Sequence, residues 1–276
     1  MPSIPAAKHV HHFLSGVLVV SVAWLTPFSS YAQHASPPPS HVLAEGEDLT
    51  YNVSYGPFDL GEVKISIERK VETPGYLAYF GTALIRSYKG VPFVDLHAVY
   101  ESTIDTGVFS RAFVGKSRED NVWDFARYTF EYDKNRVLME MGRRDTIVER
   151  RDTLPVEVHS HDGLSLFFYA RDQLFSGKRM NIPAVVKEKK GNTYIDFRGE
   201  RKSVEIDVVD YPIDVIGFDG TAEFVGIFGL TGDFEGWFSN DDARVPIVAK
   251  MKVILGSVRL ELIRWKRTGW IPPRGE

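Results

Sequence analysis

The sequence contains no cysteine. The chain therefore cannot form a disulfide, a thiolate metal site or a thiol nucleophile, and it cannot carry a lipid on a cysteine side chain. Its fold must depend on an apolar core. A chain of 276 residues with 43% hydrophobic composition is large enough to build one.

The sequence also lacks the short motifs of the commonest enzymes. It has no glycine-rich phosphate loop, Gly-x-Ser-x-Gly elbow, His-Glu-x-x-His motif or dinucleotide fingerprint. No long block of one charge occurs and the net charge is -4, whereas nucleic-acid binding needs a concentrated basic surface. We interpret the basic clusters at residues 187–190 and 264–267 as solvated strand ends. We therefore expect no nucleic-acid partner and no cofactor.

The first residues have the layout of a secretory signal peptide. Lys8 precedes an apolar run at residues 13–25, and Ser30 and Ala32 are the small residues that a cleavage site after Ala32 requires. The run is short for a transmembrane helix. We expect residues 1–32 to be a removable leader, with an uncleaved membrane anchor as the alternative. The prediction is an exported protein, periplasmic or secreted, without a transmembrane span after cleavage.

A proline-rich tether at residues 33–44, a single β domain at residues 45–267 and a loose tail at residues 268–276 are expected after the leader. Residues 49–55 and 61–71 alternate apolar and polar side chains with the period of two that is typical of half-buried strands. The connections between such segments are too short for crossover helices, which favours antiparallel pairing. In the second half, strands are predicted at residues 181–187, 193–198, 203–209, 222–228, 234–239, 245–255 and 257–266.

One α-helix is predicted, at about residues 162–176. Its apolar side chains fall within an arc of roughly 120° on a helical wheel. Ser160 or Asp162 can cap its start, and Gly177 can end it in the left-handed conformation. The expected fold class is all-β, a curved antiparallel sheet or barrel with this amphipathic helix embedded in it. A closed barrel and two packed sheets both satisfy the pattern.

A polar turn at residues 239–244 contains Asp241, Asp242 and Arg244. The two carboxylates could act as an acid and base pair or hold calcium. A turn in which these side chains bind their own backbone explains them more economically. Arg171 lies in the centre of the helix's apolar arc, and a buried arginine needs a carboxylate. We expect Asp241 or Asp242 to be its partner.

His159, His161 and Asp162 lie together where a strand leads into the helix. Imidazole and carboxylate groups at this spacing could bind a divalent metal. The favoured interpretation is that Asp162 caps the helix and the histidines are surface turn residues, so no metal site is predicted.

Aromatic residues are plentiful in the helix and in the late strands. We select Phe167, Phe168 and Trp237 as candidates to line a ligand cavity in a curved sheet, with core packing as the alternative. The full set is Phe167, Phe168, Phe175, Phe224, Phe228, Phe234, Trp237 and Phe238.

Three motifs follow one another along residues 45–266. They are Gly46-Glu47-x-Leu49-x-Tyr51-x-Val53-x-Tyr55-Gly56 followed by Leu60-Gly61-Glu62, then Asp162-Gly163-Leu164-Ser165-x5-Arg171, then Gly232-x4-Trp237-x3-Asp241-x2-Arg244-x-Pro246 followed by Gly256-Ser257-Val258. In this order and spacing they resemble the bacterial domain-of-unknown-function family 3108. The resemblance implies a mainly β envelope protein without an established activity. It carries over Asp162, Arg171, Trp237, Asp241 and Arg244 as motif residues, with no catalytic role.

The leading functional hypothesis is a non-catalytic envelope protein that binds a lipid or another apolar or amphipathic ligand in the concavity of the sheet. An alternative is a scaffold or assembly factor that engages an envelope protein through exposed sheet edges. A second alternative is a hydrolase that uses Asp241 and Asp242, or the cluster of His159, His161 and Asp162.

Overall fold

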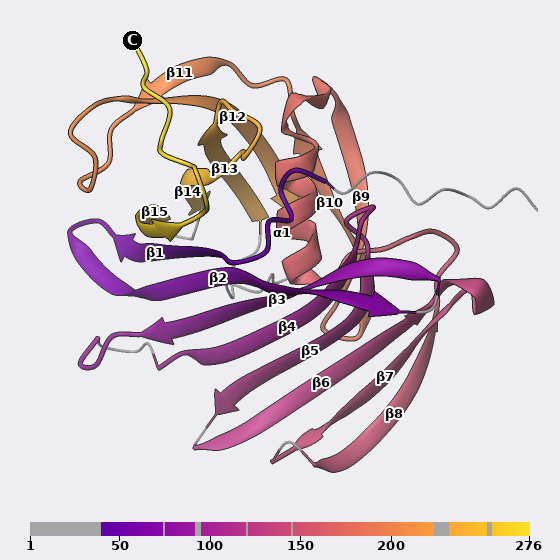
Figure 1. Cartoon of the computed structure of the whole chain (residues 1–276). Coiled ribbons are helices and arrows are strands. Elements are labelled where there is room, and N and C mark those ends of the chain that lie inside the picture. The colour runs from indigo at the N-terminus through magenta and orange to yellow at the C-terminus, as the bar shows by residue number, and fades with distance from the viewer. Residues whose placement is uncertain are drawn as a thin grey trace, which may run out of the picture. The chain divides into compact units, whose positions relative to one another are not determined.

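Alternating apolar and polar residues build a 15-stranded antiparallel sheet (Figure 1). In β2 the side chains of Val63, Ile65 and Ile67 are buried, whereas the residues between them are partly exposed. Each strand of the first half pairs with the next, as the short connections predicted. These strands are β1 (Glu47–Tyr55), β2 (Phe58–Thr73), β3 (Tyr76–Ser87), β4 (His97–Asp105), β5 (Ser110–Glu119), β6 (Val122–Glu131), β7 (Arg136–Arg143) and β8 (Ile147–Pro155).

The structure is a computed structural model that describes residues 40–73, 75–91, 95–119, 121–144, 146–223, 232–252 and 256–276. The expected leader at residues 1–32 and the tether at residues 33–39 lie outside the described residues. Phe224 and Phe228 also lie outside them.

The strand predicted at residues 222–228 lies mostly outside the described residues, and the strand predicted at residues 203–209 lies at Arg201–Val204. The second half also contains a strand that was not predicted, at Ile213–Ala222. The sequence did not indicate the strand at Ile213–Ala222 because Gly217 and Gly220 lie inside it, and glycine within a segment is typical of a turn. The strands are β9 (Arg179–Val186), β10 (Lys189–Asp196), β11 (Arg201–Val204), β12 (Ile213–Ala222), β13 (Gly232–Ser239), β14 (Pro246–Lys252) and β15 (Ser257–Lys266).

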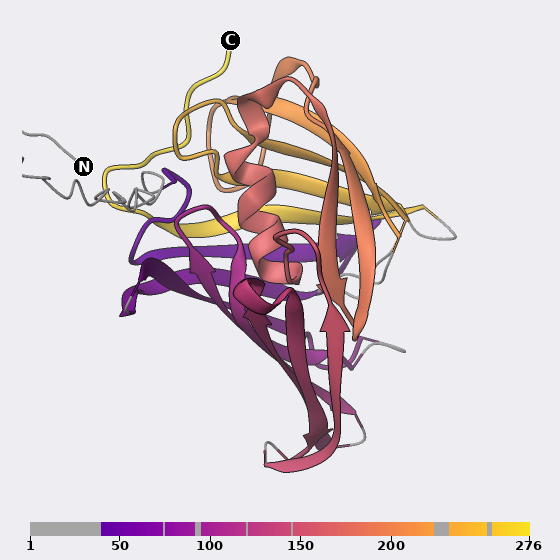
Figure 2. The ribbon, with the colours of Figure 1, turned by 90° about the vertical axis from the view of Figure 1, so that its right-hand side faces the viewer.

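The sheet is one continuous surface rather than two separate sheets. Its order is β8-β7-β6-β5-β4-β3-β2-β1-β15-β14-β13-β12-β10-β9, with β11 added to β12. The first and last strands are therefore neighbours, and β8 and β9 are the two ends of this path. The sheet does not close into a barrel, but it curves around the helix α1 (Gly163–Asp172) (Figure 2).

The predicted helix is confirmed. Asp162 caps its start, because the carboxylate accepts hydrogen bonds from the main-chain amides of Leu164 and Ser165. A short 3-10 turn at Leu174–Ser176 follows, and Gly177 has the expected left-handed conformation, with φ of 62°. No helix among the described residues is long and apolar enough to cross a membrane.

The helix joins two parts of the hydrophobic core. Leu164 and Phe168 pack into the main cluster, which includes buried residues of β1 to β4, β12, β14 and β15. Ala170 and Leu174 pack into a smaller cluster with Ile182 and aromatic residues of the second half. Two sides of α1 are thus held by the core, one in each cluster.

Both ends of the described chain are more ordered than the sequence predicted. Val42 and Leu43, assigned to the tether, are buried in the main core. The tail at residues 268–276 was expected to be loose, and this is wrong. The main-chain carbonyl of Pro273 accepts a hydrogen bond from the amide of Asp214, and the amide of Gly275 donates to Pro212. These hydrogen bonds attach the tail to the start of β12.

Candidate functional site

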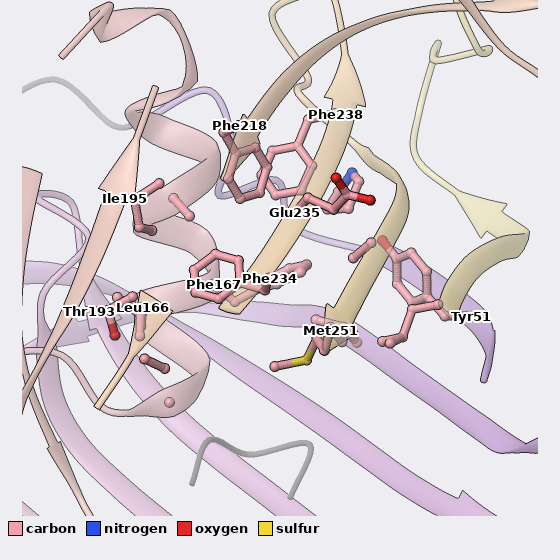
Figure 3. Close-up of a pocket in the computed structure, with 17 residues that line it drawn as sticks. Tyr51, Leu166, Phe167, Thr193, Ile195, Phe218, Phe234, Glu235, Phe238 and Met251 are labelled. Atoms are coloured by element: carbon pink, nitrogen blue, oxygen red, sulfur yellow. The ribbon is translucent and has the colours of Figure 1, made fainter. Parts of the chain in front are cut away.

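An apolar cavity of about 150 Å³ lies between α1 and the inner face of the sheet (Figure 3). Its walls include Leu166 and Phe167 from α1, Ile195 from β10, Phe218 from β12 and Phe234 and Phe238 from β13. A dry apolar cavity of roughly this volume holds one benzene-sized group. This is below the ~300 Å³ at which pockets for drug-sized ligands begin.

The aromatic wall of the cavity depends on two glycines that face the rings across a strand pair. In the register of β12 and β13, Phe218 lies opposite Gly236 and Gly220 lies opposite Phe234. A Cβ atom at Gly236 would lie 2.4 Å from Cζ of Phe218, and one at Gly220 would lie 2.5 Å from Cζ of Phe234. Each ring therefore lies over the glycine of the opposite strand, and no larger residue fits there.

Two of the residues that line the cavity have a buried hydroxyl group without a hydrogen-bond partner among the described residues. They are Tyr51 of β1 and Thr193 of β10, whose exposed fractions are 3% and 2%. A buried hydroxyl that lacks a partner costs about 1–3 kcal/mol. Burial raises the pKa of Tyr51, so its hydroxyl stays protonated and can donate a hydrogen bond.

The three aromatic candidates occupy different places. Phe167 lines the cavity. Phe168 is fully buried in the main core. Trp237 is not among the lining residues, and its ring lies 3.9 Å from the ammonium group of Lys202 and 5.1 Å from that of Lys250. Only Phe167 remains a candidate to contact a ligand in this cavity.

The prediction that Asp241 or Asp242 pairs with Arg171 is wrong. Arg171 is fully buried and donates two hydrogen bonds to the carboxylate of Glu47, at 2.6 and 3.0 Å. Its other N–H groups donate to the main-chain carbonyls of Ala243 and Arg244, at 2.9 and 3.1 Å. The turn predicted to meet Arg171 does so, but through main-chain carbonyls instead of the carboxylates of Asp241 and Asp242.

Asp241 stabilises its own turn. Its Oδ1 accepts hydrogen bonds from the Ser239 hydroxyl and from the amides of Ala243 and Arg244, and its Oδ2 accepts from the indole of Trp270. Asp242 is exposed. Asp241 thus binds the backbone of its own turn, as the favoured interpretation predicted. Among the described residues, no group of histidine and carboxylate side chains is placed to hold a metal ion.

Asp162 lies in a buried network of serine hydroxyls. Its Oδ2 accepts hydrogen bonds from Ser102 and Ser110 at 2.6 and 2.7 Å, and Ser110 lies 2.7 Å from the hydroxyl of Ser165. Burial raises the pKa of Asp162, although the serine and amide hydrogen bonds oppose this shift. With its acceptor positions occupied, the carboxylate positions the start of α1.

The two histidines differ in their surroundings. His161 is buried and contacts the rings of Phe109 and Tyr169, whereas His159 is exposed and contacts the rings of Phe109 and Tyr132. Desolvation lowers the pKa of His161 to about 3, so its imidazole is neutral at pH 7. The prediction that both histidines are surface residues is wrong for His161.

A second groove, of about 400 Å³, lies between β4 to β8 and the end of β9. Its lining is more polar, and part of it is already paired. Arg143 lies 3.4 Å from the carboxylate of Asp124, and the hydroxyl of Tyr128 donates to Glu188 at 3.2 Å. We therefore place the candidate ligand site in the apolar cavity.

The sequence matches the family described as protein of unknown function (DUF3108) over residues 50–263. The chain belongs to the DUF3108 family. Among curated proteins, none matches it.

Two solved structures show how a DUF3108 chain compares with known folds. The first is a β-barrel-like protein of the domain-of-unknown-function family DUF1849 from Brucella abortus, with 10% identity, a TM-score of 0.53 and coverage of 82% of this chain and 98% of that one. The second is a candidate exported protein with a YmcC-like fold from Bacteroides fragilis, with 8% identity, a TM-score of 0.34 and coverage of 83% and 98%. The first likeness supports a barrel-like β fold and no function.

The motif residues of this DUF3108 chain mainly hold the fold together. Asp162 caps α1, Arg171 joins α1 to β1, Asp241 shapes the turn before β14, and Arg244 donates to the main-chain carbonyl of Asp172 at the end of α1. Sequence reasoning missed the roles of Tyr51, Thr193 and Phe218 in the cavity. The sequence did contain one sign of the cavity, on the helix. Gly163, Leu166, Phe167 and Ala170 follow the spacing of one helix face, and all four line the cavity.

Proposed function

We propose that this protein is an exported, non-catalytic binding protein that holds an apolar or amphipathic ligand in the cavity between α1 and the sheet. The observation that carries the proposal is the cavity itself, with a wall of phenylalanine rings and two lining residues whose hydroxyl groups have no partner among the described residues. Sites for small organic ligands have this composition, since apolar walls supply affinity and a few polar groups fix orientation.

The volume limits what the cavity can hold. At about 150 Å³ it accommodates one ring or a short alkyl segment. A lipid would place only the end of one chain, or one small group, inside it. The leader pattern at residues 1–32 supports an exported location. An exported protein would meet such lipids and their precursors in the cell envelope.

The carboxylate clusters support a binding protein over a hydrolase. Asp162 and Asp241 each accept several hydrogen bonds from the protein itself, and His161 is buried beside aromatic rings. A general acid or base needs a free acceptor and an open approach for substrate. In their place the cavity offers an apolar surface.

The test is native mass spectrometry of the mature protein purified from its own host, followed by organic extraction. The expected result is a retained small-molecule mass that extraction removes. Ala249→Leu, which fills the cavity from β14, should lose this mass. Ala112→Leu in β5 is the matched control, because Ala112 is not among the lining residues and should keep it. A bare polypeptide mass, or equal retention by both variants, would refute the proposal.

Strand β8 supports a second candidate, a scaffold that engages another envelope protein by strand addition. It is an end strand of the sheet, and most of its residues are exposed. Its charged run Glu149-Arg150-Arg151-Asp152 would restrict pairing to a strand with complementary charges. A photo-crosslinker at Arg151, compared with one at exposed Lys202 of β11, would trap such a partner in cells. Equal trapping, or none, at the two positions would count against it.

A further inference from the structure

Tyr51 and Thr193 place their unpartnered hydroxyls on opposite sides of the cavity (Figure 3). Tyr51 is in β1 and Thr193 in β10, and the strands β15, β14, β13 and β12 lie between them in the sheet. The rings of Phe167 and Phe234 lie between the two residues in the same view. The cavity therefore has an apolar middle and a hydroxyl at each side.

The two sides differ in their surroundings. Glu47, Leu49 and Tyr51 alternate along β1 and are all buried. Glu47 accepts hydrogen bonds from both Arg171 and Arg267, so two guanidinium groups share one carboxylate. Arg171 and Glu47 both lie close enough to act on the Tyr51 hydroxyl, in opposite directions, whereas Ile195 and Leu166 make the lining beside Thr193 apolar.

We infer that the ligand is an acyl compound whose carbonyl oxygen accepts a hydrogen bond from Tyr51. Its apolar body, of about six carbon atoms within the cavity, runs past Phe167 and Phe234 toward Thr193. A phenol hydroxyl is a stronger hydrogen-bond donor than an alcohol hydroxyl, which favours Tyr51 over Thr193 as the donor. A free acid and an ester share this chemistry. The inference rests on the proposed function, because it assigns the ligand class of the same cavity.

The experiment compares three probes that have the same number of carbon atoms, namely n-hexane, methyl pentanoate and hexanoate, by NMR titration of the mature protein at pH 7. Wild type should bind at least one of the two acyl probes about tenfold more tightly than n-hexane, the effect of one net hydrogen bond. Tyr51→Phe, which removes only the hydroxyl, should abolish this preference. The control Tyr88→Phe removes a hydroxyl that donates to Asn52 away from the cavity, and it should retain the preference. Tighter binding of hexanoate would identify a free acid, and tighter binding of methyl pentanoate an ester.

The failures of the two proposals are distinguishable. If none of the probes binds and the natural protein carries no ligand, the cavity is not a binding site and both proposals fall. If all three probes bind equally, or if Tyr51→Phe keeps the preference, the binding site stands and the acyl assignment is wrong. If Thr193→Val and not Tyr51→Phe abolishes the preference, the oxygen lies at the other side of the cavity and the assignment to Tyr51 is overturned.

Discussion

Arg171 and Glu47 form a two-point ion pair in the interior, although 124 residues separate them in the sequence. Their exposed fractions are 0% and 1%. The pair connects α1 to β1, and the carbonyls of Ala243 and Arg244 connect the same guanidinium to the turn before β14. Arg267, just after β15, also donates to Oε2 of Glu47. Four separate segments of the chain thus meet at Glu47 and Arg171.

Replacing Glu47 should strongly destabilise the protein. Glu47→Gln leaves Arg171 buried without its counter-charge, and breaking a buried pair in this way costs about 3–5 kcal/mol. Urea unfolding followed by circular dichroism would measure the loss. Lys64→Met is the control, because the pair of Lys64 with Asp48 has side-chain exposures of 44% and 31% and should contribute less than about 1 kcal/mol. Equal losses in both variants would contradict the assigned role of the buried pair.

Local chemistry made part of this arrangement predictable from the sequence. The period-two alternation in β2, the cap at Asp162 and the left-handed Gly177 depend on neighbouring residues, and all three were predicted correctly. The need of Arg171 for a carboxylate was also predicted. Its partner was not, because Glu47 lies in the polar run Glu45-Gly46-Glu47-Asp48, which resembles a solvated strand end. Only the pairing of β1 with β15 buries that carboxylate beside α1.

The cavity could not be predicted in the same way. Its wall depends on the register of β12 and β13, which places Phe218 over Gly236 and Phe234 over Gly220. A shift of one residue would turn these rings to the other face of the sheet. The sequence shows the aromatic residues but not this register, and so Trp237 and Phe167 looked equivalent.

Loss of the Asp162 carboxylate should cost more than an ordinary helix cap. Asp162→Ala removes the acceptor for two amides of α1, worth about 0.5–2 kcal/mol, and leaves the buried hydroxyls of Ser102 and Ser110 with fewer partners, at about 1–3 kcal/mol. Asp162→Asn keeps an oxygen for the amides and should lose less. Urea unfolding of the two variants measures the difference. Equal losses would show that the oxygen kept for the two amides, and with it the cap, contributes nothing.

His161 should make the protein less stable in acid. Its folded-state pKa of about 3 lies below its ordinary value of 6.5. The unfolded chain therefore binds more protons between these two pH values, and stability falls as the pH falls through this window, by up to roughly 4 kcal/mol. His161→Gln removes the titrating group and should flatten the dependence of the urea midpoint on pH between about 6.5 and 4. Asp162 is present in both proteins, so its own titration cancels. Parallel curves for wild type and His161→Gln would refute this role.

The close approach of Phe218 to Gly236 predicts a variant that changes the cavity without altering a polar group. In Gly236→Ala the new methyl group would lie 2.4 Å from Cζ of Phe218, so the ring must move. Such overpacking typically costs about 1–3 kcal/mol, and the displaced ring should also weaken the binding of methyl pentanoate.

Gly217→Ala is the matched control on the adjacent strand, because its new methyl group would lie 3.3 Å from the nearest atom, Nε1 of Trp237. This variant should keep both stability and binding close to wild type, since Trp237 is not among the residues that line the cavity. Urea unfolding and NMR titration of both variants test the point. Normal binding in Gly236→Ala would mean that the ring of Phe218 does not form the wall that the ligand contacts.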